Sequence, residues 1–130
     1  MIRSIRATRS ALCLPASERR FIERAREVES DLVILDLEDS VQPDLKEDAR
    51  AATIAALSSG SWRTPARAVR INALGSAWAK SDLAALAYCA AGLSEVVVPK
   101  VHTARELDPV DAALRVAEQS ARLPAGSIGI

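Results

Sequence analysis

The sequence predicts an α/β fold with a parallel sheet, because short apolar runs typical of strands alternate with helical patterns along all 130 residues. One strand and one helix repeat about every 30 residues, the size of a strand–helix–strand unit. Hydrophobic residues make up 49% of the chain, enough for one domain with a buried core. An open doubly wound sheet and a closed barrel both satisfy this pattern, and both bind ligands at the carboxyl ends of their strands. Polar residues at those strand ends therefore indicate function.

Apolar strand-like runs are expected at residues 10–15, 32–37, 66–72 and 95–101, and a fifth run starts at 127–130. A helix is predicted in each gap between them. The first helix should pack Phe21, Ala25 and Val28 against the sheet, because these apolar residues recur at i, i+4 and i+7. Ser17 is the residue expected to cap its start.

The second helix is expected to open at Asp44, which can cap the first turn while Glu47 bonds back to it, and to end before Gly60. The third should begin near Asp82 and stop at Gly92, a residue that suits the end of a helix.

A capping box at residues 103–106 predicts the start of the fourth helix. Pro109 follows a few residues later. It either kinks this helix or restarts it with Asp108 as a second cap, and the sequence leaves both options open.

The charges of the chain balance, with 17 basic and 17 acidic residues. Such a surface lacks the basic footprint of a nucleic-acid-binding protein, and no long apolar run indicates a membrane contact, so small soluble partners are favoured. Cys13 and Cys89 lie in apolar surroundings without metal-site spacing, which predicts buried free thiols and a reducing, cytoplasmic compartment. Residues 1–10 hold three arginines and no acid, a faint transit-peptide pattern, but the apolar segment that follows fits a first strand better.

The second strand ends in three carboxylates within four positions, at Asp36, Glu38 and Asp39. Because side chains alternate along a strand, Asp36 and Glu38 share one face with Ile34. Two acids at the carboxyl end of a buried strand suit a divalent cation, which prefers oxygen ligands. The alternative is a strand that runs into a solvated turn whose acids cap the next helix, and local sequence does not decide between the two.

Basic and amide side chains close the next two strands. Arg70 and Asn72 share one face of the third strand, and Lys100 ends the fourth, so inward-facing strands would bring both cations beside the acids. A fixed guanidinium can hold a carboxylate or stabilise an oxyanion, which suits an organic acid substrate. Two structural alternatives stay open: Arg70 can form a buried ion pair with Asp36 or Glu38, and Lys100 can extend into water.

Four blocks of sequence, taken together, resemble one known family. They are residues 9–15, residues 33–41 with Pro43 and 46–50, residues 69–72 and residues 98–101, in matching order and spacing over nearly the whole chain. The chain is similar to the citrate lyase beta subunit family, the CitE-like branch of the HpcH/HpaI aldolases. The resemblance implies a (β/α)8 TIM barrel, usually assembled as a homotrimer. It also implies Mg²⁺-dependent cleavage or formation of carbon–carbon bonds in acyl-CoA or 2-oxo acid substrates.

The resemblance assigns roles to individual residues. Arg70 matches the family's catalytic arginine, which binds the substrate oxygen that becomes an enolate, and Asn72 and Lys100 join it in substrate binding. Glu38 and Asp39 match the acidic pair near the metal, which they are expected to reach through water, and Asp36 supports them.

The resemblance implies two direct Mg²⁺ ligands, a Glu at the end of the fifth strand and an Asp shortly after the next, and both positions are expected past Ile130. The expectation is therefore one partial domain over residues 1–130, the N-terminal half of a TIM barrel truncated in the fifth strand. An exposed edge and an open apolar inner face would follow. Such a fragment is expected to be inactive alone.

The sequence leaves three candidate functions. The first is a Mg²⁺-dependent lyase of the citryl-CoA or malyl-CoA type, which performs retro-Claisen cleavage of a 3-hydroxyacyl thioester. The second is a non-catalytic remnant that binds carboxylates or CoA. The third is a signalling receiver domain, which is disfavoured because receivers need an acidic pair after the first strand, where this chain has residues 14–17, Leu-Pro-Ala-Ser.

Overall fold

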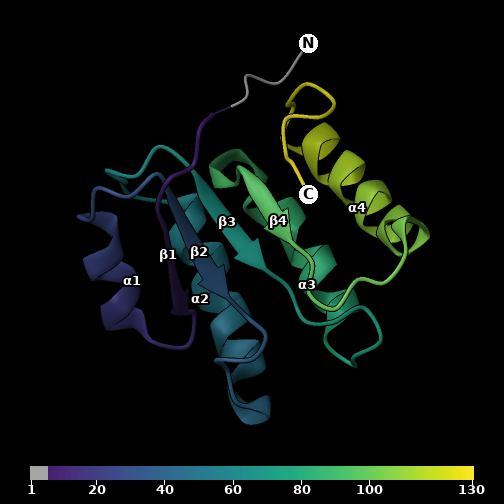
Figure 1. Cartoon of the computed structure of the whole chain (residues 1–130), viewed down its shortest axis with the longest axis horizontal. Coiled ribbons are helices and arrows are strands. Elements are labelled where there is room, and N and C mark those ends of the chain that lie inside the picture. The colour runs from purple at the N-terminus through teal and green to yellow at the C-terminus, as the bar shows by residue number, and fades with distance from the viewer. Residues whose placement is uncertain (1–5) are drawn as a thin grey trace.

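A sheet of four parallel strands forms the centre of the chain in the computed structural model, which describes residues 6–130 (Figure 1). The strands lie in chain order, which confirms the predicted α/β fold with a parallel sheet. They are β1 (Ala11–Pro15), β2 (Leu32–Asp36), β3 (Arg67–Arg70) and β4 (Glu95–Val97). The expected fifth strand is present only as a single parallel bridge between Glu95 and Gly129. The transit-peptide pattern of residues 1–10 lies partly outside the described residues.

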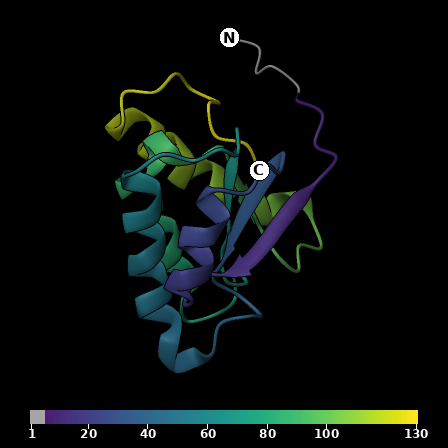
Figure 2. The same cartoon turned by 90° about the vertical axis from the view of Figure 1, so that its left-hand side faces the viewer.

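The helices alternate with the strands along the chain, and the first two lie on one side of the sheet (Figure 2). They are α1 (Arg19–Arg26), α2 (Lys46–Ser58), α3 (Ala79–Ala85) and α4 (Asp108–Ser120), with short 3-10 turns at Pro43–Leu45, Leu86–Tyr88, Ala90–Gly92 and Ala104–Leu107. None of the helices within residues 6–130 is long and apolar enough to cross a membrane.

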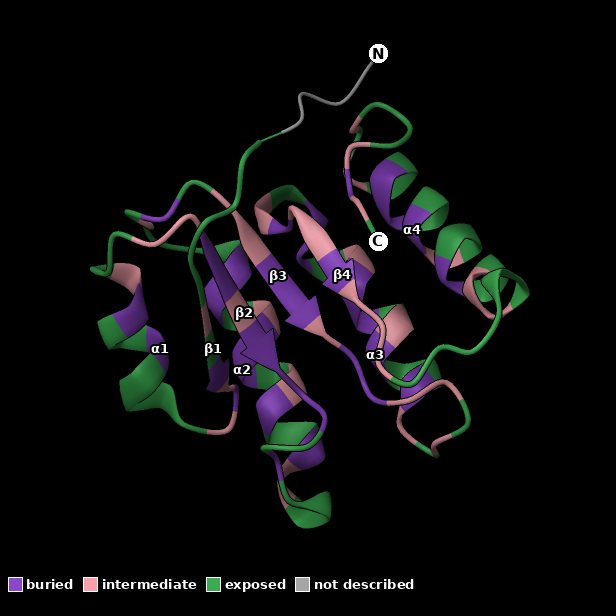
Figure 3. Cartoon of the chain, viewed as in Figure 1, coloured by how far each residue is buried: buried purple, intermediate pink, exposed green. Residues whose placement is uncertain are grey.

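The strand register separates a covered face from an open one. Leu14, Leu35, Val69 and Val96 are aligned across the sheet, all are buried, and they belong to the hydrophobic core that also contains the buried residues of the helices. Figure 3 shows buried positions along the strands and on the helices beside them. The neighbouring row on the opposite face includes Cys13, which is exposed. The prediction that both cysteines are buried is therefore wrong for Cys13, which lies on the edge strand β1.

Cys89 behaves as the sequence predicts. Its thiol is free and buried, and burial raises its pKa to about 11. The thiolate is the reactive form of cysteine, so Cys89 is a packing residue at neutral pH.

Helix α1 is rotated relative to its predicted face. Ile22 and Ala25 are buried, whereas the side chains of Phe21 and Val28 are 50% and 40% exposed. The prediction was correct for Ala25 only, and Glu18 rather than Ser17 precedes the first helical turn. Phe21 and Val28 instead line a groove of about 330 Å³ beside β1. They stay exposed because the outer edge of β1 has no neighbouring strand among the described residues.

Helices α2 and α4 do not begin with the caps that the sequence predicts. Asp44 does not cap α2, because a 3-10 turn at Pro43–Leu45 precedes that helix. The capping box at Thr103 and Glu106 is present, but it caps the start of the 3-10 turn at Ala104–Leu107. Helix α4 begins directly after this turn, at Asp108. Of the two roles left open for Pro109, the restart is confirmed, although Asp108 is the first helical residue rather than a cap.

The predicted third helix is broken into pieces. Helix α3 ends at Ala85 and two 3-10 turns carry the chain to Gly92, the predicted end point. Asp82 is not at the start of this helix but inside its first turn, and its side chain is buried. A buried carboxylate needs partners, and these belong to the polar site described next.

Candidate functional site

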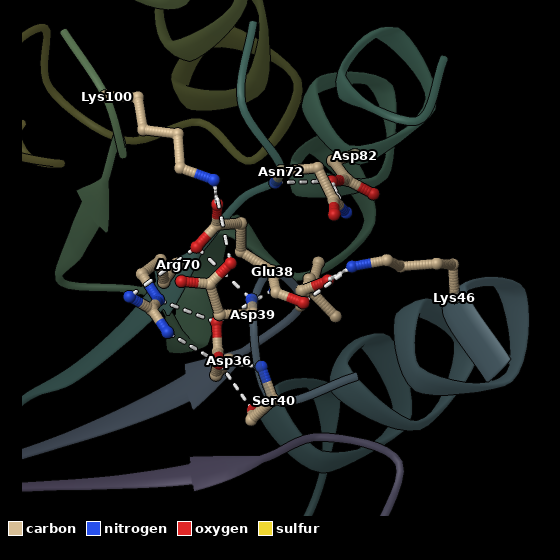
Figure 4. A network of polar contacts seen from close by, with 10 residues as sticks. Asp36, Glu38, Asp39, Ser40, Lys46, Arg70, Asn72, Asp82 and Lys100 are labelled. Atoms are coloured by element: carbon tan, nitrogen blue, oxygen red, sulfur yellow. Dashed lines mark hydrogen bonds and ion pairs between the residues drawn. The ribbon is translucent and has the colours of Figure 1, made fainter. Parts of the chain in front are cut away.

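Polar side chains from three parts of the sheet meet at its carboxyl edge (Figure 4). Asp36 is the last residue of β2 and Arg70 the last of β3, and the parallel register places them side by side. Glu38 and Asp39 follow β2, and Lys100 lies in the loop after β4. The inward-facing arrangement expected from strand alternation is therefore present.

Asp36 and Arg70 form a bidentate ion pair. Arg70 Nε donates to Asp36 Oδ1 at 2.7 Å and Arg70 Nη2 donates to Oδ2 at 2.8 Å. The same carboxylate also accepts the backbone N–H groups of Glu38 and Ser40 and the Ser40 hydroxyl. Burial alone would raise the pKa of Asp36, but the hydrogen bonds from Arg70 and Ser40 outweigh it and hold that pKa well below its ordinary value.

A second ion pair lies nearer to solvent. Lys100 Nζ is 2.6 Å from Glu38 Oε1 and 3.6 Å from Asp39 Oδ1, so its ammonium lies between the two acids. The hydrogen bond to Glu38 raises the pKa of Lys100. The Lys100 side chain is 61% exposed, yet its charged end contacts protein rather than extending freely into water. Glu38 also lies 3.6 Å from Arg70 Nη1, which links the two pairs.

Asn72 is held by a carboxylate that sequence reasoning missed. Asp82 Oδ2 accepts both the backbone N–H of Asn72, at 2.9 Å, and its side-chain amide, at 2.7 Å. Arg50 Nε neutralises the other Asp82 oxygen at 2.9 Å. The only sequence signal was an acid at the expected start of α3, which looks like an ordinary cap. Asn72 is thus fixed beside the site, with its amide turned to Asp82.

Lys46 is the other residue whose role the pattern did not reveal. Its buried ammonium donates to the carbonyl oxygens of Leu37 and Glu38, at 2.8 and 2.6 Å, and lies 5.2 Å from the centre of the Trp78 ring. Burial lowers the pKa of Lys46. The contacts close the turn that carries Glu38 and Asp39.

We expect Lys46→Met to lower the free energy of unfolding by about 2–3 kcal/mol, because two buried carbonyl groups lose a charged donor. Urea denaturation of the two proteins measures this. Lys80→Met is the matched control, since Lys80 is an exposed lysine in α3, and it should change stability by less than about 0.5 kcal/mol. Equal effects of the two substitutions would contradict the role given to Lys46.

The acids near Arg70 do not by themselves make a metal site. Among residues 6–130, no group of three His, Cys, Asp or Glu side chains is arranged to hold a metal ion. Hydrogen bonds fill both oxygens of Asp36, and Glu38 is already paired with Lys100. Direct coordination of Mg²⁺ by these residues alone does not fit the geometry.

Comparison with known proteins gives consistent matches. The family model described as HpcH/HpaI aldolase/citrate lyase matches residues 9–130. A (3S)-malyl-CoA thioesterase from Cereibacter sphaeroides is 36% identical over 104 residues, which are 80% of this chain and 36% of that protein. An L-malyl-CoA/beta-methylmalyl-CoA lyase from the same species is 34% identical over 116 residues, which are 88% of this chain and 36% of the lyase.

Two solved structures are also similar. RipC from Yersinia pestis is 32% identical with a TM-score of 0.64, over 85% of this chain and 43% of RipC. CitE from Mycobacterium tuberculosis, solved in complex with magnesium, acetoacetate and coenzyme A, is 35% identical with a TM-score of 0.62, over 77% of this chain and 35% of CitE. The chain spans about a third of the length of the curated relatives it matches.

Proposed function

The chain belongs to the HpcH/HpaI aldolase/citrate lyase family, and on that premise we propose that it supplies one wall of the active site of a carbon–carbon lyase for acyl-CoA substrates. The observation that carries this proposal is the placement of Arg70. Its guanidinium is oriented by a buried carboxylate, lies at the carboxyl edge of a parallel sheet and keeps 29% of its side chain exposed. That is the place where α/β folds bind their ligands.

The architecture proposed for the whole site is a TIM barrel, of which residues 1–130 form one partial domain, the N-terminal half. Three features support it: the parallel strand order, the alternation of strands and helices, and an outer edge of β1 that pairs with no strand among residues 6–130. The likeness to CitE supports it as well. A homo-oligomer, a trimer by family resemblance, and a cytoplasmic location belong to the same proposal.

The reaction proposed is retro-Claisen cleavage of a 3-hydroxyacyl thioester of the malyl-CoA or citryl-CoA type. A carboxylate at the mouth of the site takes the proton of the 3-hydroxyl group, the adjacent carbon–carbon bond breaks, and the electrons move onto the thioester oxygen as an enolate. Arg70 donates hydrogen bonds to that oxygen and so lowers the barrier. Lys100 and Asn72 are proposed to contact the rest of the substrate.

Mg²⁺ is the cofactor proposed for the complete site, with its direct ligands outside the described residues. Glu38 and Asp39 would reach it through water. A Lewis acid beside the enolate oxygen would reinforce Arg70. Residues 6–130 include no group of acidic, histidine or cysteine side chains arranged to hold the ion alone, so none of the steps above depends on it.

Hydrolysis of the same thioester is the second candidate, because the 36%-identical relatives are malyl-CoA thioesterases. Polarisation of the thioester oxygen by Arg70 serves both reactions, since both develop negative charge there. The two differ in the bond that breaks and in the nucleophile. The lyase breaks the carbon–carbon bond and consumes no water, whereas hydrolysis adds water to the thioester carbon and breaks its bond to the CoA sulfur.

Product analysis separates them. Residues 9–130 would replace the matched segment of the C. sphaeroides malyl-CoA lyase, and the chimera would be given malyl-CoA. The proposal expects acetyl-CoA and glyoxylate. Release of free CoA and malate would favour the thioesterase, and absence of turnover in a folded chimera would favour a remnant that only binds carboxylates or CoA.

A further inference from the structure

We propose that Asp36 is a positioning residue for Arg70: it holds the Nε and Nη2 side of the guanidinium so that the Nη1 end faces the mouth of the site, where a substrate oxyanion binds. The inference rests on the proposed function of Arg70. It adds to the role expected for Asp36 from sequence, which was support of the acidic pair near the metal.

The hydrogen bonds of Arg70 leave one end of the guanidinium available. A guanidinium has five N–H groups in a rigid planar fork. Asp36 accepts from Nε and Nη2, while the contact of Nη1 with Glu38 is 3.6 Å long, beyond a hydrogen bond. Within the described part of the chain, no hydrogen bond from Nη1 is present. The end that carries Nη1 is therefore the one that can meet a ligand.

The hydrogen bonds of Asp36 leave no place for a cation. Oδ1 accepts from Glu38 N and Arg70 Nε, and Oδ2 accepts from Ser40 N, Ser40 Oγ and Arg70 Nη2. A carboxylate offers about four lone-pair sites, so five donors saturate it. Its side chain is also completely buried. All of the acceptor sites of Asp36 are therefore used by Arg70 and by the turn after β2.

The exposure of the pair places the guanidinium, not the carboxylate, where a ligand can reach it. Arg70 is 29% exposed while Asp36 is 0% exposed. Asp36 also binds the backbone of Glu38 and Ser40, so one buried carboxylate fixes both Arg70 and the acidic turn beside it. A donor fixed in this way loses little conformational freedom when a ligand binds.

The test measures the Arg70 side chain directly, by NMR of the ¹⁵N-labelled chain, with the Nε–H signal assigned by its loss in Arg70→Lys. In Asp36→Asn, exchange of this proton with water should rise about tenfold or more, because the neutral amide has no charge and only one acceptor oxygen for the two N–H groups that Asp36 now binds. Acetoacetate, the acid present in the CitE structure, is the binding probe, and its dissociation constant should rise about tenfold in the same variant.

Glu118→Gln is the matched control. Glu118 is a buried carboxylate that accepts the backbone N–H groups of Gly126 and Ile128, away from the site. It should leave the acetoacetate affinity within about twofold of the wild type, a difference below 1 kcal/mol. If Asp36→Asn does not fold, Asp36→Glu serves instead, since it keeps the charge but displaces the guanidinium.

Unchanged proton exchange and unchanged acetoacetate affinity in the Asp36 variant would overturn the positioning role. Failure of the proposed function looks different: acetoacetate would then bind equally well to the wild type and Arg70→Lys, or to neither. In that case the exchange rate of the Arg70 Nε–H alone decides whether Asp36 holds the guanidinium.

Discussion

Arg70→Ala is expected to lower the free energy of unfolding by about 3–5 kcal/mol at pH 7, because it leaves Asp36 buried without its cation. A small domain is stable by only about 5–15 kcal/mol, so this loss approaches the whole stability of the fold. The change therefore cannot be treated as a silent removal of a functional group. Urea denaturation followed by circular dichroism measures it.

The loss should depend on pH in a defined direction. The pKa of Asp36 is lowered in the folded protein, so its ion pair stabilises the fold above the ordinary aspartate pKa of about 4 and loses this contribution as the pH falls below it. The difference between wild type and Arg70→Ala should accordingly be complete at pH 7 and smaller at pH 3. Arg63→Ala is the control, because Arg63 and its partner Glu29 are both exposed, and it should cost less than about 1 kcal/mol. An equal loss at both pH values would contradict the ion-pair explanation.

Gly92→Ala should be the most disruptive conservative change outside the site. A Cβ atom at Gly92 would lie 2.0 Å from the carbonyl oxygen of Leu57 in α2, so the backbone of one segment must move. Overpacking of this kind costs about 3 kcal/mol and sometimes more.

Thermal unfolding of Gly92→Ala and Gly75→Ala provides a matched comparison. A Cβ at Gly75 meets no atom within 4 Å, so that variant should stay within about 0.5 kcal/mol of the wild type. A Gly92→Ala protein as stable as Gly75→Ala would show that the two segments pack less closely than described.

The sheet and the nearness of Arg70 to the acids after β2 could be predicted from sequence because both depend on local rules. Strand alternation with period two assigns Asp36 and Arg70 to faces, and parallel pairing of consecutive strands places the two residues side by side. The resemblance to the lyase family then gave Arg70 its proposed role. The structure adds that Arg70 is already bound to Asp36, which sequence left as an alternative.

Other features depend on tertiary contacts that no local pattern encodes. Asn72 can pair with Asp82 only because α3 turns its Asp82 side chain toward the end of β3. An irregular segment connects β3 to α3, so local sequence does not set the orientation of this helix. The exposure of Phe21 and Cys13 depends on what covers the edge and open face of the sheet, and that is not written in their own sequence neighbourhood. The sequence-based predictions for these residues used only residue type and spacing, which do not report such contacts.

The most direct test of the central claim is the turnover of Arg70→Lys in the malyl-CoA lyase chimera. Lysine keeps a positive charge beside Asp36 but lacks the planar fork that binds the carboxylate bidentately and presents a further N–H group to an oxyanion in a fixed direction. We predict that kcat falls about 100- to 1,000-fold, the effect of losing one donor to a developing oxyanion. Arg115→Lys, which alters an exposed pair with Asp111 in α4, should leave kcat unchanged. An Arg70→Lys chimera as active as the Arg115→Lys control would contradict the claim that this chain supplies the substrate arginine.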